Sequence, residues 1–526
     1  MRCWVWFPAL GLLSWMCCSL EPVEGGKVLV IPVDGSHWLS MKILVKELTH
    51  RGHDVVVVVP ESSLLMNGSE SYRTQHYKVP YSKAELDDKY TELKDSAFIK
   101  PPEFPSLFGN LFLLVNFTEF HVKGCRALLN NQSLMSQLRK EGFNVVLTDP
   151  FLPCGAVLAH IFNIPVVYFM NLLPCDLDVK ANQCPVPLSY VPKAFSKNTD
   201  VMTFLQRVKN NIMGMVEYLV CWAAYAQFDV LVNDYVEKDM TYKDLLSHAA
   251  LWLPKYDFVL DWPKPVMPNV VFIGGINCAK ARPLPADLEA FVEGSGEDGF
   301  IIFTLGSMMS TMPEEIAKHF FEAFAKIPQK VLWRYTGVQP QNVPKNVKLM
   351  KWLPQNDLLA HPKAKAFLTH GGSHGVYEGI CNAVPMLMFP LFGDQEDNVL
   401  RLVVRGVAES LSMFDVTTDK LLAALNNVIN DEGYKERMVK LSTLHLDRPV
   451  HPVDLAAFWT EFVMRHNGAA HLRVAAHDLN WFQYHSLDVI GFLLTVVVLA
   501  LWLALKCCLF CTRKCCGKKT AKSKSE

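Results

Sequence analysis

The chain has 526 residues, half of them hydrophobic, and a formal net charge of -1. That length exceeds what one hydrophobic core normally supports, so at least two domains are expected. The near-neutral balance of charge gives no electrostatic support for nucleic acid as a partner.

The first 25 residues have the pattern of a secretory signal peptide. Arg2 precedes an apolar run from Trp4 to about Leu20, and small and polar residues follow. A buried first helix or a signal anchor is the alternative, but a strand pattern begins almost at once. Cleavage is expected between Cys18 and Gly26.

Strand and helix patterns alternate along the body of the chain. Apolar strand patterns over 28–33 and 54–60 flank a helical pattern over 38–51, and further strand patterns follow at 144–150 and 164–169. Because these strands are apolar throughout, we expect a parallel sheet that is covered on both faces.

His37 stands at the end of the first strand pattern, after the turn Asp34-Gly35-Ser36. A lone histidine in such a place more often packs in a loop than acts as a base. Its function therefore depends on whether a partner and a substrate site lie nearby.

Sequons and cysteines are spread over the body. Three glycosylation sequons begin at Asn67, Asn116 and Asn131. Seven cysteines lie between the two ends of the chain, an odd number without metal-ligand spacing, so at least one is unpaired or intermolecular. Cys175 and Cys184 are a plausible disulfide pair.

A long amphipathic helix pattern covers 201–226. Most such helices are core elements, and attachment to a membrane surface is the alternative. A second α/β series begins near residue 298, after a stretch over 276–299 that is rich in Pro, Gly and charge and is typical of a linker. We predict two doubly wound, Rossmann-like domains that face a cleft, with ligands beyond the carboxyl ends of the strands.

The segment 352–395 is the richest in candidate binding residues. A strand pattern ends at His370-Gly371-Gly372, and a helix pattern begins near Ser373. The free N–H groups of such a helix start favour a phosphate or diphosphate. Trp352 offers a flat surface for a base, and Glu378 could accept hydrogen bonds from ribose hydroxyls. Asp394 and Gln395 form an acid-amide pair that suits the hydroxyls of a sugar.

The carboxyl end predicts one membrane-spanning helix. Residues 489–505 carry no charge, and with 507–510 they approach the roughly 20 residues that span a bilayer. The basic tail that follows is cytosolic by the positive-inside rule, which makes the body lumenal. Lysines three and five residues from the end resemble the dilysine retrieval signal of the endoplasmic reticulum. The predicted parts are a signal peptide (1–25), an N-terminal domain (26–280), a C-terminal domain (281–440), helices that pack back toward the N-terminal domain and the membrane (441–485), a transmembrane helix (486–508) and a basic cytosolic tail (509–526).

Three motifs carry a resemblance to a known family. They are W-x-x-Q from Trp352, T-H-G-G-S-H-G-V-Y-E-G from Thr369 and P-L-F-G-D-Q from Pro390. Together they resemble the signature of UDP-glycosyltransferases with the GT-B fold, and the match is closer to the vertebrate UDP-glucuronosyltransferases of family 1. The similarity runs from the signal peptide to the basic tail.

The resemblance implies a role for each matching residue. Trp352 would stack on uracil with Gln355 beside it, Glu378 would hold the ribose, and Asp394 with Gln395 would bind the donor sugar. The residues expected to face the diphosphate are Ser307, His370, Gly372, Ser373 and His374.

The resemblance also makes His37 and Asp149, the aspartate of a T-D-P motif, the catalytic pair of an acceptor-binding N-terminal domain. A phenol or alcohol is a poor nucleophile until its proton is removed, and imidazole can take that proton. The imidazolium formed needs a counter-charge, and a carboxylate also fixes its orientation. The implied reaction is inverting transfer of glucuronate from UDP-glucuronate to hydroxyl, amine or carboxyl groups, which gives β-glucuronides.

One departure concerns the donor. Where the family often has an arginine near the glucuronate carboxylate, this chain has Lys255, which keeps the charge and loses the bidentate fork. Use of another UDP-sugar, such as UDP-glucose, therefore stays open. A non-catalytic protein that binds lipid or nucleotide-sugar is the alternative from another class, although such a protein would not need a base.

The resemblance implies that no metal is required. The one D-x-D motif, Asp176-Leu-Asp178, follows no clear strand, and a helix-based diphosphate site makes it redundant. The expected partners are the UDP-sugar, a small lipophilic acceptor such as a phenol or a bilirubin- or steroid-like compound, and membrane lipid. Homo- or hetero-oligomers with related transferases stay open.

Overall fold

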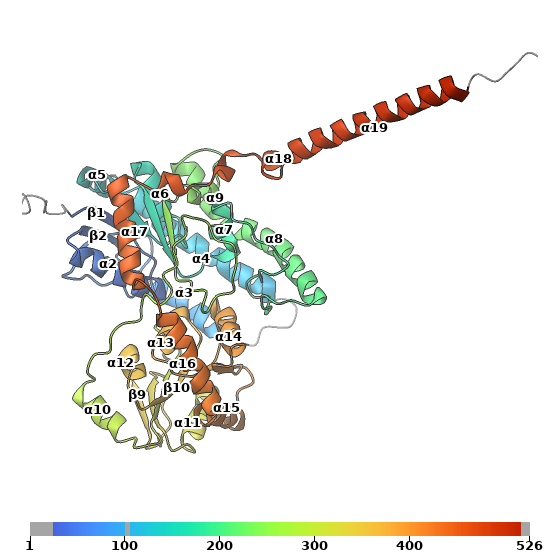
Figure 1. Ribbon diagram of the computed structural model, residues 1–526. Helices are drawn as coiled ribbons and strands as arrows, with labels where there is room; N and C mark the ends of the chain where they lie inside the picture. The colour runs from blue at the N-terminus through green and yellow to red at the C-terminus, as the bar shows by residue number, and fades with distance from the viewer. Residues whose placement is uncertain (1–24, 100–105, 517–526) are drawn as a thin grey trace, which may run out of the picture. The chain divides into compact units, whose positions relative to one another are not determined.

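The computed structural model describes residues 25–99 and 106–516, so the predicted signal peptide up to residue 24 and the tail beyond residue 516 lie outside the described residues. The chain divides into two compact units, residues 1–472 and 473–526. The first unit contains two six-stranded sheets (Figure 1).

The N-terminal sheet is parallel, with the strand order β3-β2-β1-β4-β5-β6. Its strands are apolar and buried, as the sequence predicts, except for the edge strand RTQHY, which is polar and only partly buried. Helices cover both faces. The strands are β1 (Lys27–Ile31), β2 (Asp54–Pro60), β3 (Arg73–Tyr77), β4 (Val145–Thr148), β5 (Val166–Met170) and β6 (Leu251–Pro254). The helices are α2 (Ser36–His50), α3 (Lys83–Ser96), α4 (Ser106–Leu129), α5 (Gln132–Glu141), α6 (Cys154–Phe162), η1 (Pro174–Asp176), α7 (Leu177–Ala181), α8 (Phe204–Tyr235) and α9 (Tyr242–Leu246).

The second sheet repeats this topology, with the order β12-β11-β10-β7-β8-β9. Its strands are β7 (Phe300–Thr304), β8 (Lys330–Arg334), β9 (Val347–Met350), β10 (Ala364–Thr369), β11 (Met386–Met388) and β12 (Ala408–Ser410). The helices are α10 (Ala286–Glu293), α11 (Glu314–Phe324), α12 (Gln355–Leu359), α13 (Ser373–Cys381), α14 (Gln395–Val403), α15 (Thr418–Asn430) and α16 (Glu432–Leu446). The prediction of two doubly wound domains is confirmed.

The topology determines where ligands bind. In each sheet the strand order reverses between the first and fourth strands, which are β1 and β4 in one sheet and β7 and β10 in the other. Ligands of open parallel sheets bind beyond the carboxyl ends of the strands at such a switch point. Because Ile31 pairs with Thr148 and Thr304 with Thr369, the residues that follow each pair leave the sheet at the same edge.

Helix α17 (Pro452–His466) packs on α2 and buries Ala456, Ala457 and Val463 in the N-terminal core, although it follows α16 of the second half (Figure 1). A short 3-10 turn, η2 (Ala470–Leu472), ends this unit.

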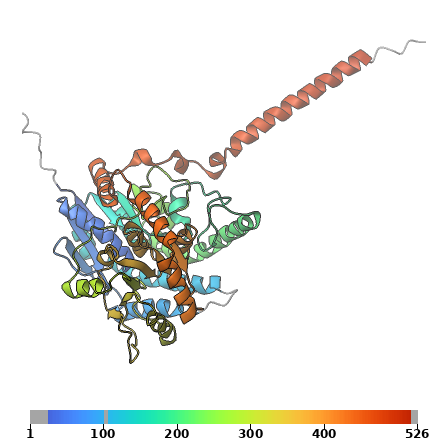
Figure 2. The same cartoon turned by 60° about the horizontal axis from the view of Figure 1, so that its bottom comes forward.

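The second unit contains η3 (Ala475–Asp478), α18 (Trp481–Tyr484) and α19 (Leu487–Cys516). Figures 1 and 2 show α19 as one continuous helix. Its length and apolar composition are sufficient to cross a membrane, and its described side chains are exposed.

Helix α8 is also long and apolar enough to cross a membrane, but part of it is a core element. Ala224, Phe228 and Leu231 are buried in the N-terminal core, whereas Leu205 and Trp222 are exposed. Within the predicted range 201–226, the prediction of a core helix is therefore confirmed only near its end, where Cys221, Ala224 and Tyr225 are buried.

The disulfides correct one expectation. The described chain forms Cys125–Cys154, Cys175–Cys221 and Cys278–Cys381, and Cys184 is free. The predicted pairing of Cys175 with Cys184 is wrong, because α8 packs on η1 and brings Cys221 to Cys175. Spacing along the sequence does not reveal such helix packing.

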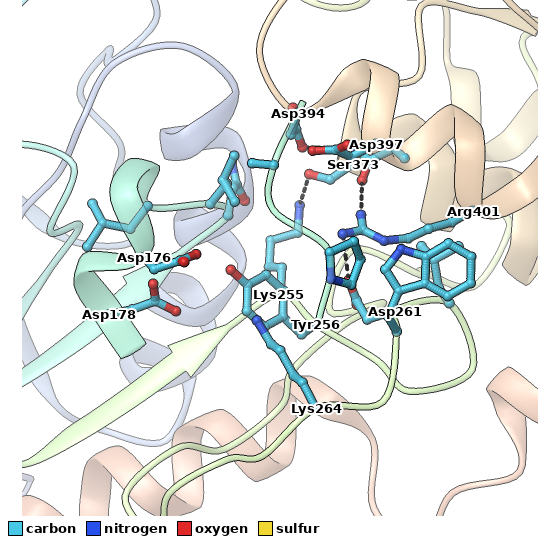
Figure 3. A pocket seen from close by; sticks show the side chains of 18 of the residues that line it. Asp176, Asp178, Lys255, Tyr256, Asp261, Lys264, Ser373, Asp394, Asp397 and Arg401 are labelled. Atoms are coloured by element: carbon cyan, nitrogen blue, oxygen red, sulfur yellow. Dashed lines mark hydrogen bonds and ion pairs between the residues drawn. The ribbon is translucent and has the colours of Figure 1, made fainter. Parts of the chain in front are cut away.

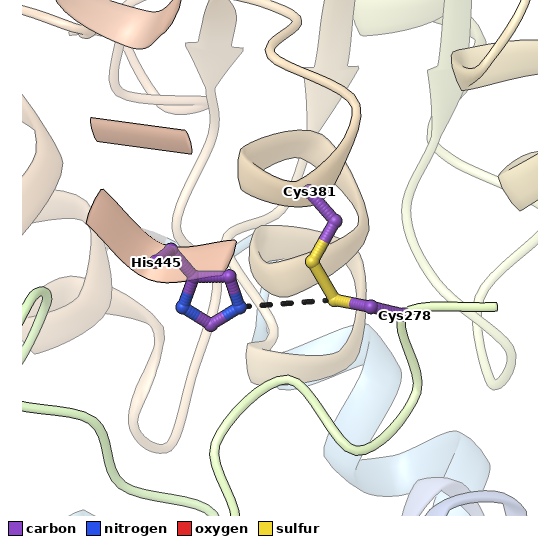
Figure 4. A group of neighbouring side chains, drawn as sticks. All are labelled: Cys278, Cys381 and His445. Carbon is purple, nitrogen blue, oxygen red and sulfur yellow. Dashed lines mark hydrogen bonds between the residues drawn. A yellow bond between two sulfur atoms is a disulfide. The ribbon is translucent and has the colours of Figure 1, made fainter. Parts of the chain in front are cut away.

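His445 lies beside the third disulfide, with its Nε2 atom 3.8 Å from Cys278 Sγ (Figure 4). A sulfur held in a disulfide is not a thiolate, which is the form of cysteine that binds metals. Cys278, Cys381 and His445 therefore do not offer a metal site in this state.

The three sequons lie in different settings. Asn67 is exposed in a loop, and Asn131 caps α5 by accepting a hydrogen bond from the Leu134 N–H at 3.1 Å. Asn116 falls within α4, and its side chain lies outside the described part of the chain. Occupancy of all three stays a prediction.

Candidate active site

The loop after β1 positions His37. Gly35 has a φ of 82°, a left-handed conformation that favours glycine, and α2 begins at the next residue. The Asp34 carboxylate organises this loop by accepting hydrogen bonds from the N–H groups of Gly35 and Leu64 and from the Ser63 hydroxyl. His37 therefore sits in the first turn of α2, at the carboxyl edge of the sheet.

Asp149 follows β4 and faces His37 across the switch point. Its Oδ2 atom is 2.6 Å from His37 Nδ1, and its Oδ1 atom accepts a hydrogen bond from the Phe151 N–H at 2.9 Å. Asp149 is 1 % exposed, whereas the His37 side chain is 22 % exposed, so the imidazole is the member of the pair that faces outward. The sequence predicted both residues, and the structure brings them together.

The electrostatics of the pair suit a base. Burial lowers the pKa of His37, but the charge and hydrogen bond of Asp149 more than offset this effect, so the net pKa lies above the usual 6.5. Asp394, from the other half of the unit, also raises the pKa of His37.

The second switch point carries a glycine-lined turn. Gly306 follows β7 with a φ of 88°, and Gly371 follows β10 with a φ of 86°. A Cβ atom on Gly306 would lie 2.5 Å from the His370 ring, and one on Gly372 would lie equally close at 2.5 Å. The two glycines therefore leave the space that the imidazole of His370 occupies. Burial lowers the pKa of His370 to about 4, so His370 is a neutral hydrogen-bond donor at physiological pH.

Gly306→Ala is expected to reduce both stability and affinity for UDP. A left-handed conformation costs an L-residue about 1–2 kcal/mol, and the new methyl group would also displace the His370 ring. Thermal unfolding with and without UDP measures both effects. Gly296→Ala is the matched control, because Gly296 has a φ of 60° but no atom within 4 Å of the position that a Cβ atom would take. An equal loss of UDP affinity in both variants would contradict the proposed role of this turn.

Arg334 stabilises the turn that follows β7. It donates hydrogen bonds to the carbonyl groups of Gly306, Ser307 and Met309, the last two at 3.1 and 2.8 Å. Its guanidinium also lies 5.3 Å from the centre of the Trp352 ring, which is 57 % exposed. The structure therefore links Ser307 to Trp352 through a residue that the sequence did not single out.

Helix α13 starts at the glycine turn. Gly372 is its N-cap and has no side chain to cap the helix, so the N–H groups of the first turn are left for another acceptor. Further along, Glu378 accepts a hydrogen bond from Gln355 and lies 3.5 Å from His374 Nε2. The predicted residues Gln355, His374 and Glu378 therefore form one cluster.

Asp394 and Gln395 follow β11 at the start of α14. Asp394 lines the cavity described below, and its binding of the donor sugar stays a prediction. Gln395 is buried, and its Oε1 atom accepts hydrogen bonds from the N–H groups of Leu391 and Phe392 at 2.8 and 3.2 Å. Only the amide N–H groups of Gln395 remain for a ligand. Gln395 could therefore donate hydrogen bonds to a sugar but not accept them.

The two halves meet at Lys255, which follows β6. Its ammonium donates to Ser40 Oγ at 2.9 Å and lies 3.5 Å from Ser373 Oγ. Ser40, one turn after His37, is in turn 3.3 Å from His374 Nδ1. Helix α2, which carries His37, is therefore in contact with α13, whose first turn has free N–H groups.

Lys255 is 2 % exposed, and no ion pair joins it to a carboxylate among residues 25–99 and 106–516. Burial lowers its pKa to about 8, although Asp394 and Glu378 partly offset this effect. Its side chain lines a polar cavity of about 90 Å³, where it points toward Ser373 (Figure 3). An ammonium without a paired anion favours a negatively charged ligand.

The D-x-D aspartates line the same cavity (Figure 3). Asp176 forms an ion pair with Lys193, and burial raises the pKa of Asp178 to about 6.

Four further residues of the site were missed from the sequence: Asp34, Ser40, Arg334 and Asn398. The role of Asp34 could have been predicted from the sequence, because an aspartate before a glycine turn often accepts backbone hydrogen bonds. The other three lie inside helix or strand patterns, where a polar residue is more often a solvated side chain.

Comparisons with known proteins show the family of the chain. The family described as "UDP-glucoronosyl and UDP-glucosyl transferase" matches residues 26–522. A UDP-glucuronosyltransferase of Pleuronectes platessa is 59 % identical over 472 residues, which cover 89 % of this chain and 100 % of that protein. UDP-glucuronosyltransferase 1A1 of Homo sapiens is 48 % identical over 510 residues, which cover 97 % of this chain and 96 % of that protein.

Solved structures of lower identity share the fold. A UDP-glucosyltransferase from Polygonum tinctorium has a TM-score of 0.57 at 15 % identity, with coverage of 84 % of this chain and 99 % of that chain. Os79 from O. sativa, in complex with UDP, has a TM-score of 0.56 at 15 % identity, with coverage of 84 % and 100 %. The chain therefore belongs to the family of UDP-glucuronosyl and UDP-glucosyl transferases, and it is a glycosyltransferase with the GT-B fold.

Proposed function

We propose that the chain transfers glucuronate from UDP-glucuronate to small lipophilic acceptors and gives β-glucuronides. The observation that carries this proposal is the 2.6 Å contact between His37 and the buried Asp149, at the switch point that faces the donor half. A protein that only binds nucleotide-sugar would not need a base with a raised pKa at this point.

His37 acts as the base in this mechanism. Its free ring nitrogen removes the proton of the acceptor hydroxyl, while Asp149 accepts the hydrogen bond of the other nitrogen and balances the imidazolium charge. The acceptor oxygen attacks the anomeric carbon from the face opposite UDP. Configuration at that carbon therefore inverts from the α-linked donor to the β-linked product.

The donor half holds UDP and stabilises its departure. Trp352 offers its exposed ring to the uracil, with Gln355 beside it, and Glu378 binds the ribose. The neutral His370 and the first-turn N–H groups of α13, with Ser373, donate to the diphosphate. We propose the same role for His374 and Ser307. Preorganised donors of this kind stabilise charge that develops on a leaving group, so we propose that no metal is required.

Lys255 selects UDP-glucuronate by binding the carboxylate of its glucuronate, and Asp394 and Gln395 bind the sugar hydroxyls. Lys255→Met is expected to lower kcat/KM for UDP-glucuronate by about 10–100-fold, since a hydrogen bond to a charged group contributes about 1.5–3 kcal/mol. UDP-glucose, which lacks the carboxylate, should be used no worse than by the parent enzyme. Because the pKa of Lys255 is about 8, the KM for UDP-glucuronate should rise as pH increases beyond that value.

Lys255→Arg is the matched control, since it keeps the charge. A loss that is equal for UDP-glucuronate and UDP-glucose in the Lys255→Met enzyme would contradict this assignment and favour another UDP-sugar as donor.

The rest of the chain supports a proposal for the location and the partners of the protein. Helix α19 anchors the protein in a membrane, and the apolar run with its basic tail supports a single-pass protein of the endoplasmic reticulum, with a lumenal body and a cytosolic tail. We propose phenols and bilirubin- or steroid-like compounds as acceptors, and oligomers with itself or with related transferases.

The test of the whole proposal is an assay of the full chain in microsomes. UDP-glucuronate, UDP-glucose and UDP-xylose are offered against a panel of phenols, and the linkage of the product is determined by NMR. We expect β-glucuronides from UDP-glucuronate. Turnover only with another sugar, or an α-linked product, would contradict the proposal.

A further inference from the structure

Asn398 is a buried amide on α14, one turn after Asp394. It is 5 % exposed. Its Nδ2 atom donates to Asp394 Oδ2 at 2.8 Å and to the Gly371 carbonyl at 3.0 Å, and its Oδ1 atom accepts from Arg401 Nη1 at 2.9 Å. One side chain therefore joins the sugar-binding carboxylate to the glycine turn of the diphosphate site.

These contacts need an amide at position 398. Only asparagine and glutamine side chains carry two N–H donors and a carbonyl acceptor, and glutamine is one methylene longer. An aspartate there would offer no donor and would place a second carboxylate beside Asp394. Because the contact between Asn398 and the Gly371 carbonyl is buried, its loss leaves a polar group unsatisfied.

Asp394 depends on this support for its orientation. It is the N-cap residue of α14, but its side chain accepts no hydrogen bond from the first turn of that helix. In the described part of the chain, Asn398 is the side chain that binds its Oδ2 atom, and no hydrogen bond to Oδ1 is found. Oδ1 is therefore left for a ligand in the cavity that Asp394 lines (Figure 3).

Arg401 extends the chain of contacts to the other half of the unit. Its Nη2 atom lies 3.6 Å from Asp261 Oδ1, on the segment that follows β6 of the N-terminal sheet. The order of contacts is therefore Asp261, Arg401, Asn398 and Asp394. One ion pair and two hydrogen bonds therefore connect the N-terminal half to the carboxylate of Asp394.

We propose that Asn398 is a positioning residue for the donor sugar. It holds Asp394 Oδ1 toward the sugar hydroxyls and keeps this carboxylate in register with the glycine turn, and Arg401 orients Asn398. The proposal rests on the sugar-binding role proposed for Asp394.

The first experiment measures Asn398→Ala in the full, detergent-solubilised chain. The kcat/KM for UDP-glucuronate should fall by about 10–100-fold, because small misplacements of a substrate-positioning group cost up to about 100-fold. The inhibition constant of UDP should stay near the parent value, since UDP lacks the donor sugar that Asp394 is proposed to bind. A merely structural role would weaken UDP as much as it weakens UDP-glucuronate. Asn398→Asp, which has the same shape, gives the same readout if the alanine variant does not fold.

A double-mutant cycle then tests whether Asn398 acts through Asp394. If it does, Asp394→Ala with Asn398→Ala should lose no more activity than Asp394→Ala alone. Losses that multiply would overturn the proposal. Parent activity of the single Asp394→Ala variant would instead overturn the proposed role of Asp394, so the two failures are distinguishable.

Asn346→Ala is the matched control. The Asn346 amide donates to the carbonyl groups of Phe324, Ile327 and Gln329, but it precedes β9, at the sheet edge opposite the site. We expect a lower melting temperature with an unchanged KM for UDP-glucuronate. A KM that rises as much as in Asn398→Ala would show that loss of any such amide disturbs the donor site, and it would overturn the proposal.

Discussion

Replacing His37 with glutamine is expected to lower kcat by about 10²–10⁴-fold, the range that general base catalysis contributes. Glutamine retains an N–H group for the buried Asp149 carboxylate, which alanine would leave unpaired. The fold and the donor half should therefore persist, and UDP should still bind with parent affinity. Steady-state glucuronidation of a phenol, with UDP affinity measured in parallel, gives both values.

The parent enzyme should also lose activity in acid. Because His37 must be neutral to accept a proton, kcat falls as pH decreases through its pKa, which Asp149 holds above 6.5. The sign for stability is opposite. A pKa that is raised in the folded state stabilises the protein fully below 6.5, and this contribution is lost as pH rises through the folded-state value.

His53→Gln is the matched control for His37→Gln. His53 is another buried histidine with a carboxylate partner, Glu461 at 3.2 Å, but it precedes β2 at the opposite edge of the sheet. Its replacement should affect stability and leave kcat unchanged. A His37→Gln enzyme that turns over phenols at the parent rate would refute the assignment of His37 as the base.

Asp149→Asn is expected to produce a second large loss, of about 10²–10⁴-fold in kcat, because the imidazolium loses its counter-charge and its fixed orientation. The pH profile should move as well. Burial lowers the pKa of His37 and Asp149 raises it, so removal of the charge lets the pKa fall below 6.5. The acid limb of the kcat profile should therefore shift to lower pH while its plateau drops.

This combination distinguishes an electrostatic role from a structural one, because misfolding would lower the plateau without moving the limb. Asp229→Asn is the control, since Asp229 also accepts a backbone hydrogen bond, from the Tyr242 N–H at 2.6 Å, but lies on α8. An acid limb that stays in place in Asp149→Asn would contradict the proposed pairing.

Much of the fold could be predicted because its signals are local. Strand segments such as residues 55–59 are apolar throughout, and turns such as His370-Gly371-Gly372 carry glycine, so their character is visible within a few residues. Helix α19 is recognisable for the same reason, since it contains the long uncharged run 489–505.

The disulfide pairing and the supporting residues of the site depend on contacts between distant segments. Cys175 pairs with Cys221 because α8 packs on η1, and spacing along the chain does not contain that information. In the sequence, Arg334 and Asn398 are ordinary polar residues of a strand and a helix. Their roles become visible only in the fold, where they donate hydrogen bonds to the turns at Ser307 and Gly371.

The sequence by itself determined the two parallel sheets, the membrane helix and the identity of the chemical groups, because residue type and short-range pattern are sufficient for each. Only the tertiary structure decided that His37 lies 2.6 Å from Asp149, that Lys255 is buried with no ion-pair partner among the described residues, and that the carbonyl oxygen of Gln395 accepts hydrogen bonds from the loop before it. The physical reason is that pKa, burial and hydrogen-bond satisfaction depend on neighbours in space, and 112 residues of chain separate His37 from its partner.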